Sequence, residues 1–157
     1  MSVLLIAADT EKLDVQTPPH GLGLVAASLK EQGFEVDCLD LLDQEDPHGT
    51  VLDALHSLHP DAIGISIHDI DDRNRQAPRF LLAKARDVVA ACREASAAPI
   101  VLGGPGFSIF PREALAYLEA DYGIRGDGEE AFPALLSCLR MSSWTGAPNW
   151  EDDVRSR

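Results

Sequence analysis

The sequence predicts a doubly wound α/β fold, in which a parallel sheet of five strands is covered by helices on both faces. Short apolar runs of strand length alternate with longer segments whose apolar residues recur at helical spacing, and five such pairs follow one another without a break. The connections are short, so the strands must run parallel and the crossovers must be right-handed. A chain of 157 residues, 45% of them apolar, has the size and the core of one domain.

The first half of the chain supplies three strands and two helices. Residues 3–8 and 62–67 are almost wholly apolar, as in buried strands, although the later run contains an unexpected serine. Residues 34–38 alternate between apolar and acidic side chains, which predicts a strand at the edge of the sheet with one face less buried. Apolar residues at helical spacing predict helices over residues 22–29 and 51–58.

The second half continues the alternation. Helical spacing predicts a third helix over residues 81–92, a fourth over 114–118 and a fifth over 132–139. The apolar run at residues 100–102 predicts the fourth strand, which a glycine-rich bend ends, and residues 121–124 form the fifth. Glycine has no Cβ, so this bend can adopt positive φ angles and let a ligand approach the backbone closely.

The domain is expected to span residues 1–140, because no periodicity remains after Arg140. Residues 141–157 place Trp144 and Trp150 among proline, glycine and acidic residues. This segment fits a linker to a further domain, a short docking segment or a poorly ordered tail.

Four unusual segments are expected to meet at one rim of the sheet. With the expected flavodoxin-like, Rossmann-like strand order 2-1-3-4-5, ligands bind beyond the carboxyl ends of the strands, where the order reverses. The loops at residues 9–17 and 68–77 each hold about ten residues, whereas βα loops typically hold about 2 to 6. The glycine bend at residues 103–107 and the segment 125–130 follow the other two strands on that side. We therefore expect the ligand site at this rim.

Composition excludes several classes of protein. The formal net charge of -13 and the scattered basic residues argue against a nucleic-acid surface. The start of the chain lacks a basic segment before its apolar run, which is too short to span a membrane. We expect a soluble, cytoplasmic protein without nucleic acid or membrane as partners. Cys38, Cys92 and Cys138 are too far apart for a local metal site or a disulfide framework, and each is expected to fill the core.

The rim carries no recognisable catalytic set. The chain has no GxSxG elbow, no phosphate-loop lysine and no His/Cys cluster with metal spacing. A phosphate loop of the flavodoxin kind would be rich in Ser and Thr, but residues 9–14 are acidic. No catalytic residue is therefore assigned.

Ser66 inside the third strand, followed by Gly103 and Gly104 at the end of the fourth, resembles the serine and double-glycine elements of cobalamin-binding domains. Four segments in order narrow the resemblance: residues 19–29 (PHGLGLVAASL), 60–66 (PDAIGIS), 102–108 (LGGPGFS) and 126–132 (GDGEEAF). Together they are similar to the N-terminal domain of cobalamin-dependent radical SAM enzymes, many of which are methylases. The resemblance covers residues 2–139.

The resemblance implies that cobalamin, as methylcobalamin or hydroxocobalamin, lies on the carboxyl rim. Its dimethylbenzimidazole tail, detached from cobalt, would enter a slot between the strands, with Ser66 lining the slot and the double glycine letting the tail pass. The chain would then bind and orient a corrinoid that supplies the chemistry. The cofactor-binding residues expected on this basis are Ser66, His68, Asp69, Gly103, Gly104, Pro105, Gly106, Phe107, Gly126, Gly128 and Glu129.

The contacts to cobalt differ from those of better-known relatives. Methionine-synthase-like and mutase-like domains have DxHxxG after the first strand, whereas this loop begins with Asp9 and contains no histidine at that spacing. We therefore expect that no histidine of this loop ligates the lower face of cobalt, and we assign no protein metal site apart from the role left open for His68. His68 and Asp69 replace the Arg-Asn pair that is common in the radical SAM subgroup. Three roles stay open for His68: an axial cobalt ligand, a partner of a corrin amide, or a loop histidine with no ligand contact.

Three other residues have structural alternatives. The Ser66 hydroxyl has to be hydrogen-bonded if it is buried, with or without a ligand. Glu129 opens a predicted helix, where a carboxylate is favourable near the positive end of the helix dipole. Phe107 can cover a corrin edge or pack at the start of the fourth helix.

A radical SAM barrel holds its iron–sulfur cluster on a CxxxCxxC run, which the three cysteines cannot supply. S-adenosylmethionine and the cluster would therefore lie on another domain or subunit, to which this chain presents the corrinoid for methyl transfer. One alternative is an interaction or regulatory domain that kept the fold and lost the ligand. Another is an independent enzyme that uses a nucleotide or flavin at the same rim.

Overall fold

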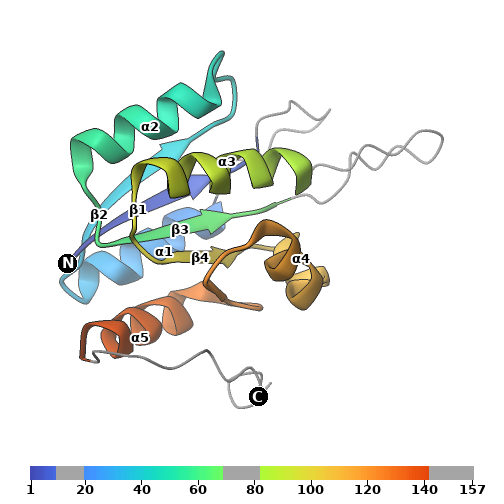
Figure 1. The fold of residues 1–157 in the computed structure, drawn as a ribbon. Helices are drawn as coiled ribbons and strands as arrows, with labels where there is room; N and C mark the ends of the chain where they lie inside the picture. Colours follow the sequence, from blue (N-terminus) through green and yellow to red (C-terminus); the bar gives the residue numbers. More distant parts are fainter. Residues whose placement is uncertain (10–19, 69–81, 142–157) are drawn as a thin grey trace.

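A computed structural model describes residues 1–9, 20–68 and 82–141 (Figure 1). Its sheet has five parallel strands in the order β2-β1-β3-β4-β5, which confirms the predicted doubly wound fold. Their bounds are β1 Ser2–Ala7, β2 Glu35–Asp40, β3 Ala62–Ser66, β4 Ile100–Gly103 and β5 Tyr122–Gly123. As predicted, β2 lies at an edge and is less buried than its neighbour β1.

Helices cover both faces of the sheet. They are α1 His20–Glu31, α2 Pro47–Leu58, α3 Leu82–Ala95, α4 Pro111–Leu118 and α5 Gly128–Met141, with a short 3₁₀ helix, η1, at Phe107–Ile109. One core joins α2, α3 and α4 to the sheet face that carries Leu4, Ile65 and Leu102. The other joins α1 and α5 to the face that carries Leu5 and Val101 (Figure 1). Alternate residues of each strand point to opposite faces, so one strand contributes to both cores.

Most bounds shift by a few residues from those expected, and the difference at α2 has a visible cause. Helix α2 begins at Pro47 rather than near residue 51, because the Asp46 carboxylate caps it by accepting a hydrogen bond of 3.0 Å from the Gly49 amide. Strand β5 is shorter than residues 121–124, although the amides of Asp121 and Ile124 still bond to carbonyls of β4. The predicted tail is not placed, since residues 142–157 lie outside the described part.

Helices α1 and α5 are joined by a hydrogen bond that a proline makes necessary. Pro133 lies inside α5 and has no amide hydrogen to donate to the carbonyl of Glu129, four residues earlier. The Ser28 hydroxyl of α1 donates to that carbonyl instead, at 2.6 Å. The bond fixes the two helices side by side over one face of the sheet.

The cysteine prediction was right at one position and wrong at two. Cys92 is fully buried in α3, and burial raises the pKa of its thiol to about 12. Cys38 and Cys138 are exposed, Cys38 on edge strand β2 and Cys138 on α5. Within the described ranges, no helix is long and apolar enough to cross a membrane.

Candidate functional site

Small residues leave a gap between the sheet and helices α1 and α5. The register of the strands aligns Ala7, Ser66 and Gly103 in one row at the carboxyl end of β1, β3 and β4. Two residues earlier, Leu5, Gly64 and Val101 form a second row on the same face. The outer row therefore contains no large side chain to fill the space below the helices.

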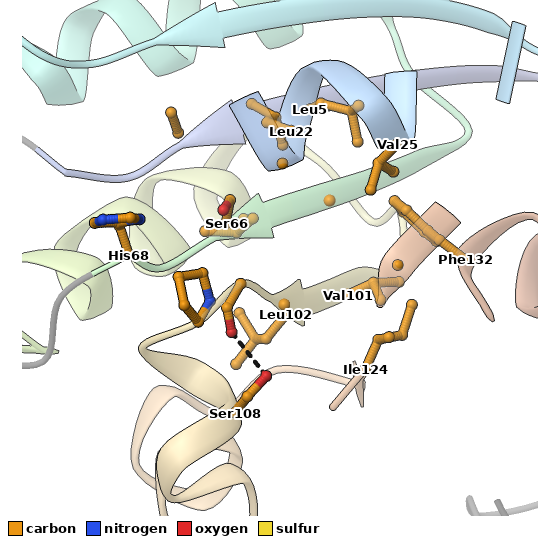
Figure 2. A pocket seen from close by; sticks show the side chains of 18 of the residues that line it. Leu5, Leu22, Val25, Ser66, His68, Val101, Leu102, Ser108, Ile124 and Phe132 are labelled. Carbon is orange, nitrogen blue, oxygen red and sulfur yellow. Dashed lines mark hydrogen bonds between the residues drawn. The ribbon is translucent and has the colours of Figure 1, made fainter. Parts of the chain in front are cut away.

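The gap is a pocket of about 920 Å³ that opens at the carboxyl rim of the sheet. In Figure 2, Phe132 lies at one end and His68 at the other, with Ser66 between them. The deeper end is closed over Gly64, where an added Cβ would lie only 2.6 Å from the Phe132 ring and 2.7 Å from Leu5. The pocket lies at the rim beside β1 and β3, where ligands are expected to bind in this fold.

Ser66 lies at the centre of the pocket floor. It is partly buried in the centre of the outer row and lines the pocket. Its hydroxyl makes no hydrogen bond to any residue in the described part of the chain. A hydroxyl that can both donate and accept is thus available to a ligand lying over β3.

The glycines of the bend are required for different structural reasons. Gly103 faces the pocket, and a Cβ added there would meet only the Ile124 carbonyl, at 3.9 Å. Gly104 has a φ of +97°, and its added Cβ would lie 2.5 Å from the Ile67 carbonyl oxygen. At Gly106 an added Cβ would lie 2.7 Å from the His68 carbonyl oxygen. Gly104 and Gly106 therefore let the bend pack on the end of β3, whereas Gly103 leaves space for a ligand.

Most of the other predicted residues line the pocket. His68, Pro105, Gly126, Gly128 and Glu129 line the pocket, and the His68 side chain is exposed at its mouth. Asp69 lies outside the described residues.

Phe107 and Gly106 do not line the pocket. Phe107 is 1% exposed, and its ring packs on Gly123 so closely that a Cβ there would overlap it. The structure thus places Phe107 in the core between η1 and β5, as the packing alternative for this residue requires.

Ser108 joins two loops of the rim. Its hydroxyl donates to the Gly104 carbonyl at 2.9 Å and accepts from the Gly126 amide at 3.0 Å (Figure 2 shows the first bond). Gly104 and Gly126 both have positive φ angles. One side chain therefore sets the separation of the loops that follow β4 and β5.

The mouth of the pocket is acidic. Asp9, Asp40, Asp127 and Glu129 line it, and none of its lining residues within the described ranges is a lysine or arginine. No group of three or more His, Cys, Asp or Glu side chains in those ranges is placed to hold a metal ion. The described part of the mouth can accept hydrogen bonds from amide groups, but its lining residues include no cation that could bind a phosphate.

Sequence analysis missed the apolar wall of the pocket. Phe132, Ile124, Val25 and Leu22 were assigned to helices and strands, and Gly64 appeared only within the segment 60–66, but none of them was expected to line the site. The usable signal was Gly64 and Ser66 two positions apart in a buried strand, because residues two apart point to the same face.

A model of the B12 binding domain matches residues 7–136. The chain belongs to the B12-binding domain family. The match includes β3, the glycine bend and most of α5, which are the elements that form the pocket.

Relatives of this B12-binding domain include radical SAM enzymes. Tryptophan 2-C-methyltransferase of Streptomyces laurentii is 30% identical over 122 residues, which are 77% of this chain and 20% of that protein. The radical S-adenosylmethionine methyltransferase TsrM from Kitasatospora setae has a TM-score of 0.83 and 26% identity, over 88% of this chain and 26% of TsrM. The cobalamin-dependent radical enzyme OxsB, at 18% identity and a TM-score of 0.65, shares the fold over 88% of this chain and 18% of OxsB. The chain thus spans about a quarter or less of these proteins.

Ser108→Ala is expected to loosen the rim and to destabilise the B12-binding domain by about 1–3 kcal/mol, because both hydrogen bonds are lost and the Gly126 amide loses its partner. Hydrogen exchange of the Gly126 amide should accelerate, and urea unfolding measures the stability. Ser57→Ala on the exposed surface of α2 serves as the control and should change neither. Unchanged exchange at Gly126 in Ser108→Ala would show that the hydroxyl does not hold this loop.

Proposed function

We propose that this chain binds cobalamin with its tail detached from cobalt and inserted between the sheet and helices α1 and α5. The observation that carries the proposal is the outer row of Ala7, Ser66 and Gly103, which opens the pocket in a chain of the B12-binding family. The Ser66 hydroxyl would bond to the ring nitrogen of the base, and the corrin ring would lie over the carboxyl rim. TsrM, which is similar to this chain, has been solved with cobalamin and a [4Fe-4S] cluster bound.

The charges at the mouth favour a corrinoid over a nucleotide or flavin. A corrin ring carries many primary amide groups, which donate hydrogen bonds that the carboxylates of Asp9, Asp40, Asp127 and Glu129 can accept. A dinucleotide would bring phosphates to a mouth whose described lining residues include carboxylates and no lysine or arginine. A corrinoid with a single phosphate in its tail is the better match in charge.

The histidines suggest how the cobalt is held. The segment after β1, residues 9–17, contains no histidine, so we propose that no side chain of that loop ligates cobalt. His68 lies exposed at the mouth and is proposed to contact the corrin, by bonding to a ring amide or to the metal. When bound, cobalamin would supply the methyl-transfer chemistry, and the chain would supply binding and orientation.

The chemistry requires a second unit. We propose that residues 1–140 present methylcobalamin or hydroxocobalamin to a radical SAM domain or subunit, and that residues 141–157 form the connection to it. TsrM supports the proposal, since it is a radical S-adenosylmethionine methyltransferase that is 26% identical to this chain, and the chain matches only a part of it. S-adenosylmethionine and an iron–sulfur cluster would bind to that unit.

Titration of the ligand-free 157-residue chain with hydroxocobalamin tests the proposal. We expect retention of about one equivalent through gel filtration and the visible spectrum of the base-off form. Ser66→Ala should weaken binding by about 3- to 10-fold, as the loss of one hydrogen bond predicts. Nitrogen coupling in the electron paramagnetic resonance spectrum of the cob(II)alamin complex, present in wild type and absent in His68→Ala, would identify His68 as a cobalt ligand. Absence of retention at tens of micromolar would instead favour an interaction domain without a ligand.

A further inference from the structure

The pocket has two chemically different parts. The mouth is polar and is lined by carboxylates and by His20 and His68. The inner part extends toward the row of Leu5, Gly64 and Val101, where Phe132 and Leu5 close over Gly64, and apolar side chains surround it. Those side chains are Leu5, Leu22, Val25, Val101, Ile124 and Phe132 (Figure 2).

The inner part offers almost no hydrogen bonds. The backbone below it belongs to β1, β3 and β4, each of which has a paired strand on both sides, so its amides and carbonyls are used by the sheet. The side chain that can bond to a ligand there is Ser66, at the border between the inner part and the mouth. A polar group that enters further loses water and gains no side-chain partner in the described part of the chain.

We propose that this inner part selects corrinoids by the base of their tail, accepting a benzimidazole and discriminating against a purine such as adenine. The inference rests on the proposed function. Detached dimethylbenzimidazole presents one unsubstituted ring nitrogen, which Ser66 can satisfy, and its remaining edge is apolar. Adenine adds an exocyclic amine and further ring nitrogens, which the walls formed by Val101, Ile124 and Phe132 leave without partners.

Three corrinoids that share one corrin ring test the selection. They are cobalamin, adeninylcobamide and cobinamide, which has no base, and equilibrium dialysis measures the dissociation constant of each with the full chain. We expect cobalamin to bind at least about 10-fold more tightly than adeninylcobamide, and cobinamide to bind most weakly. Adenine leaves cobalt more readily than dimethylbenzimidazole does in the free corrinoid, so the measured preference is a lower limit.

A pair of substitutions assigns the preference to the inner part. Val101→Thr adds one hydroxyl to the inner row with little change of shape. It should lower the ratio of the dissociation constants of adeninylcobamide and cobalamin by several-fold. Val3→Thr is the matched control. Val3 lies in β1 and is buried on the same face of the sheet as Val101, but it does not line the pocket. It should lower stability in a similar way and leave the preference unchanged.

The outcomes separate this inference from the proposed function. Equal affinities for cobalamin and adeninylcobamide, with much weaker binding of cobinamide, would overturn the selection and leave corrinoid binding intact. A preference that Val101→Thr does not change would overturn its assignment to the inner part. If none of the three corrinoids binds, the proposed function fails and this inference fails with it.

Discussion

Gly103→Val is expected to weaken cobalamin binding by at least about 100-fold, which is about 2.8 kcal/mol, while the fold persists. The added side chain would project into the outer row beside Ser66, where the tail of the corrinoid is proposed to lie. The protein itself has room for it, because a Cβ at this position meets only the Ile124 carbonyl at 3.9 Å. Valine also suits a strand better than glycine does.

Two measurements are needed for this prediction. Dialysis against hydroxocobalamin gives the affinity, and urea unfolding should place the variant within about 1 kcal/mol of the wild type. Gly23→Ala is the control, because Gly23 lies on α1 outside the pocket with open space around its Cβ position. It should bind normally. Wild-type affinity in Gly103→Val would mean that no part of the ligand lies over the end of β4.

Gly104 is the poorer position for such a test, although it is the neighbouring residue. Its positive φ and the nearby Ile67 backbone mean that any side chain there strains the bend. A loss of binding in a Gly104 variant would therefore report damage to the rim as readily as a blocked ligand.

Phe107→Ala is expected to destabilise the protein by about 3–5 kcal/mol, as removal of a fully buried aromatic ring usually does. The ring is 1% exposed and fills the space above Gly123, which has no side chain of its own. Its loss leaves a cavity between η1 and β5 that the rigid ends of β4 and β5 cannot close.

Phe110→Ala provides the comparison for Phe107→Ala. Phe110 lies three residues later and is 55% exposed, so its substitution should change the free energy of unfolding by less than about 1 kcal/mol. Urea unfolding of both variants measures the two changes in the free energy of unfolding. If Phe107→Ala keeps its stability and loses affinity for cobalamin, Phe107 contacts the ligand after all.

Much of the fold could be predicted from local pattern. The apolar runs at β1, β3 and β4 and the helical spacing of α1 to α5 repeat with so few interruptions that only one topology class suits them. Bounds were less predictable where a single side chain decides them. The Asp46 cap extended α2 toward its start, and the bonds of Asp121 and Ile124 to β4 did not extend β5.

The candidate site could be predicted only in part. The pair of Ser66 and Gly103 was expected on resemblance, and the structure brings both to one row of the sheet. Ser108 belonged to the segment 102–108, but its role could not be predicted, because its bond to the Gly126 amide spans 18 residues and depends on how two loops meet. The apolar wall was equally hidden, since spacing alone does not say whether Phe132 and Val25 meet each other or leave a gap.

The sequence by itself determined the order of strands and helices along the chain and the rim on which a ligand is expected. These two properties follow from periodicity and chain direction, which are local. The family resemblance rests instead on the order of four short segments. Only the tertiary structure decided that Gly103 faces the pocket while Gly104 faces β3, that Phe107 belongs to the core, and that Cys38 is exposed. Each of these depends on which strand or helix from a distant part of the chain packs against the residue, and no local pattern contains that information.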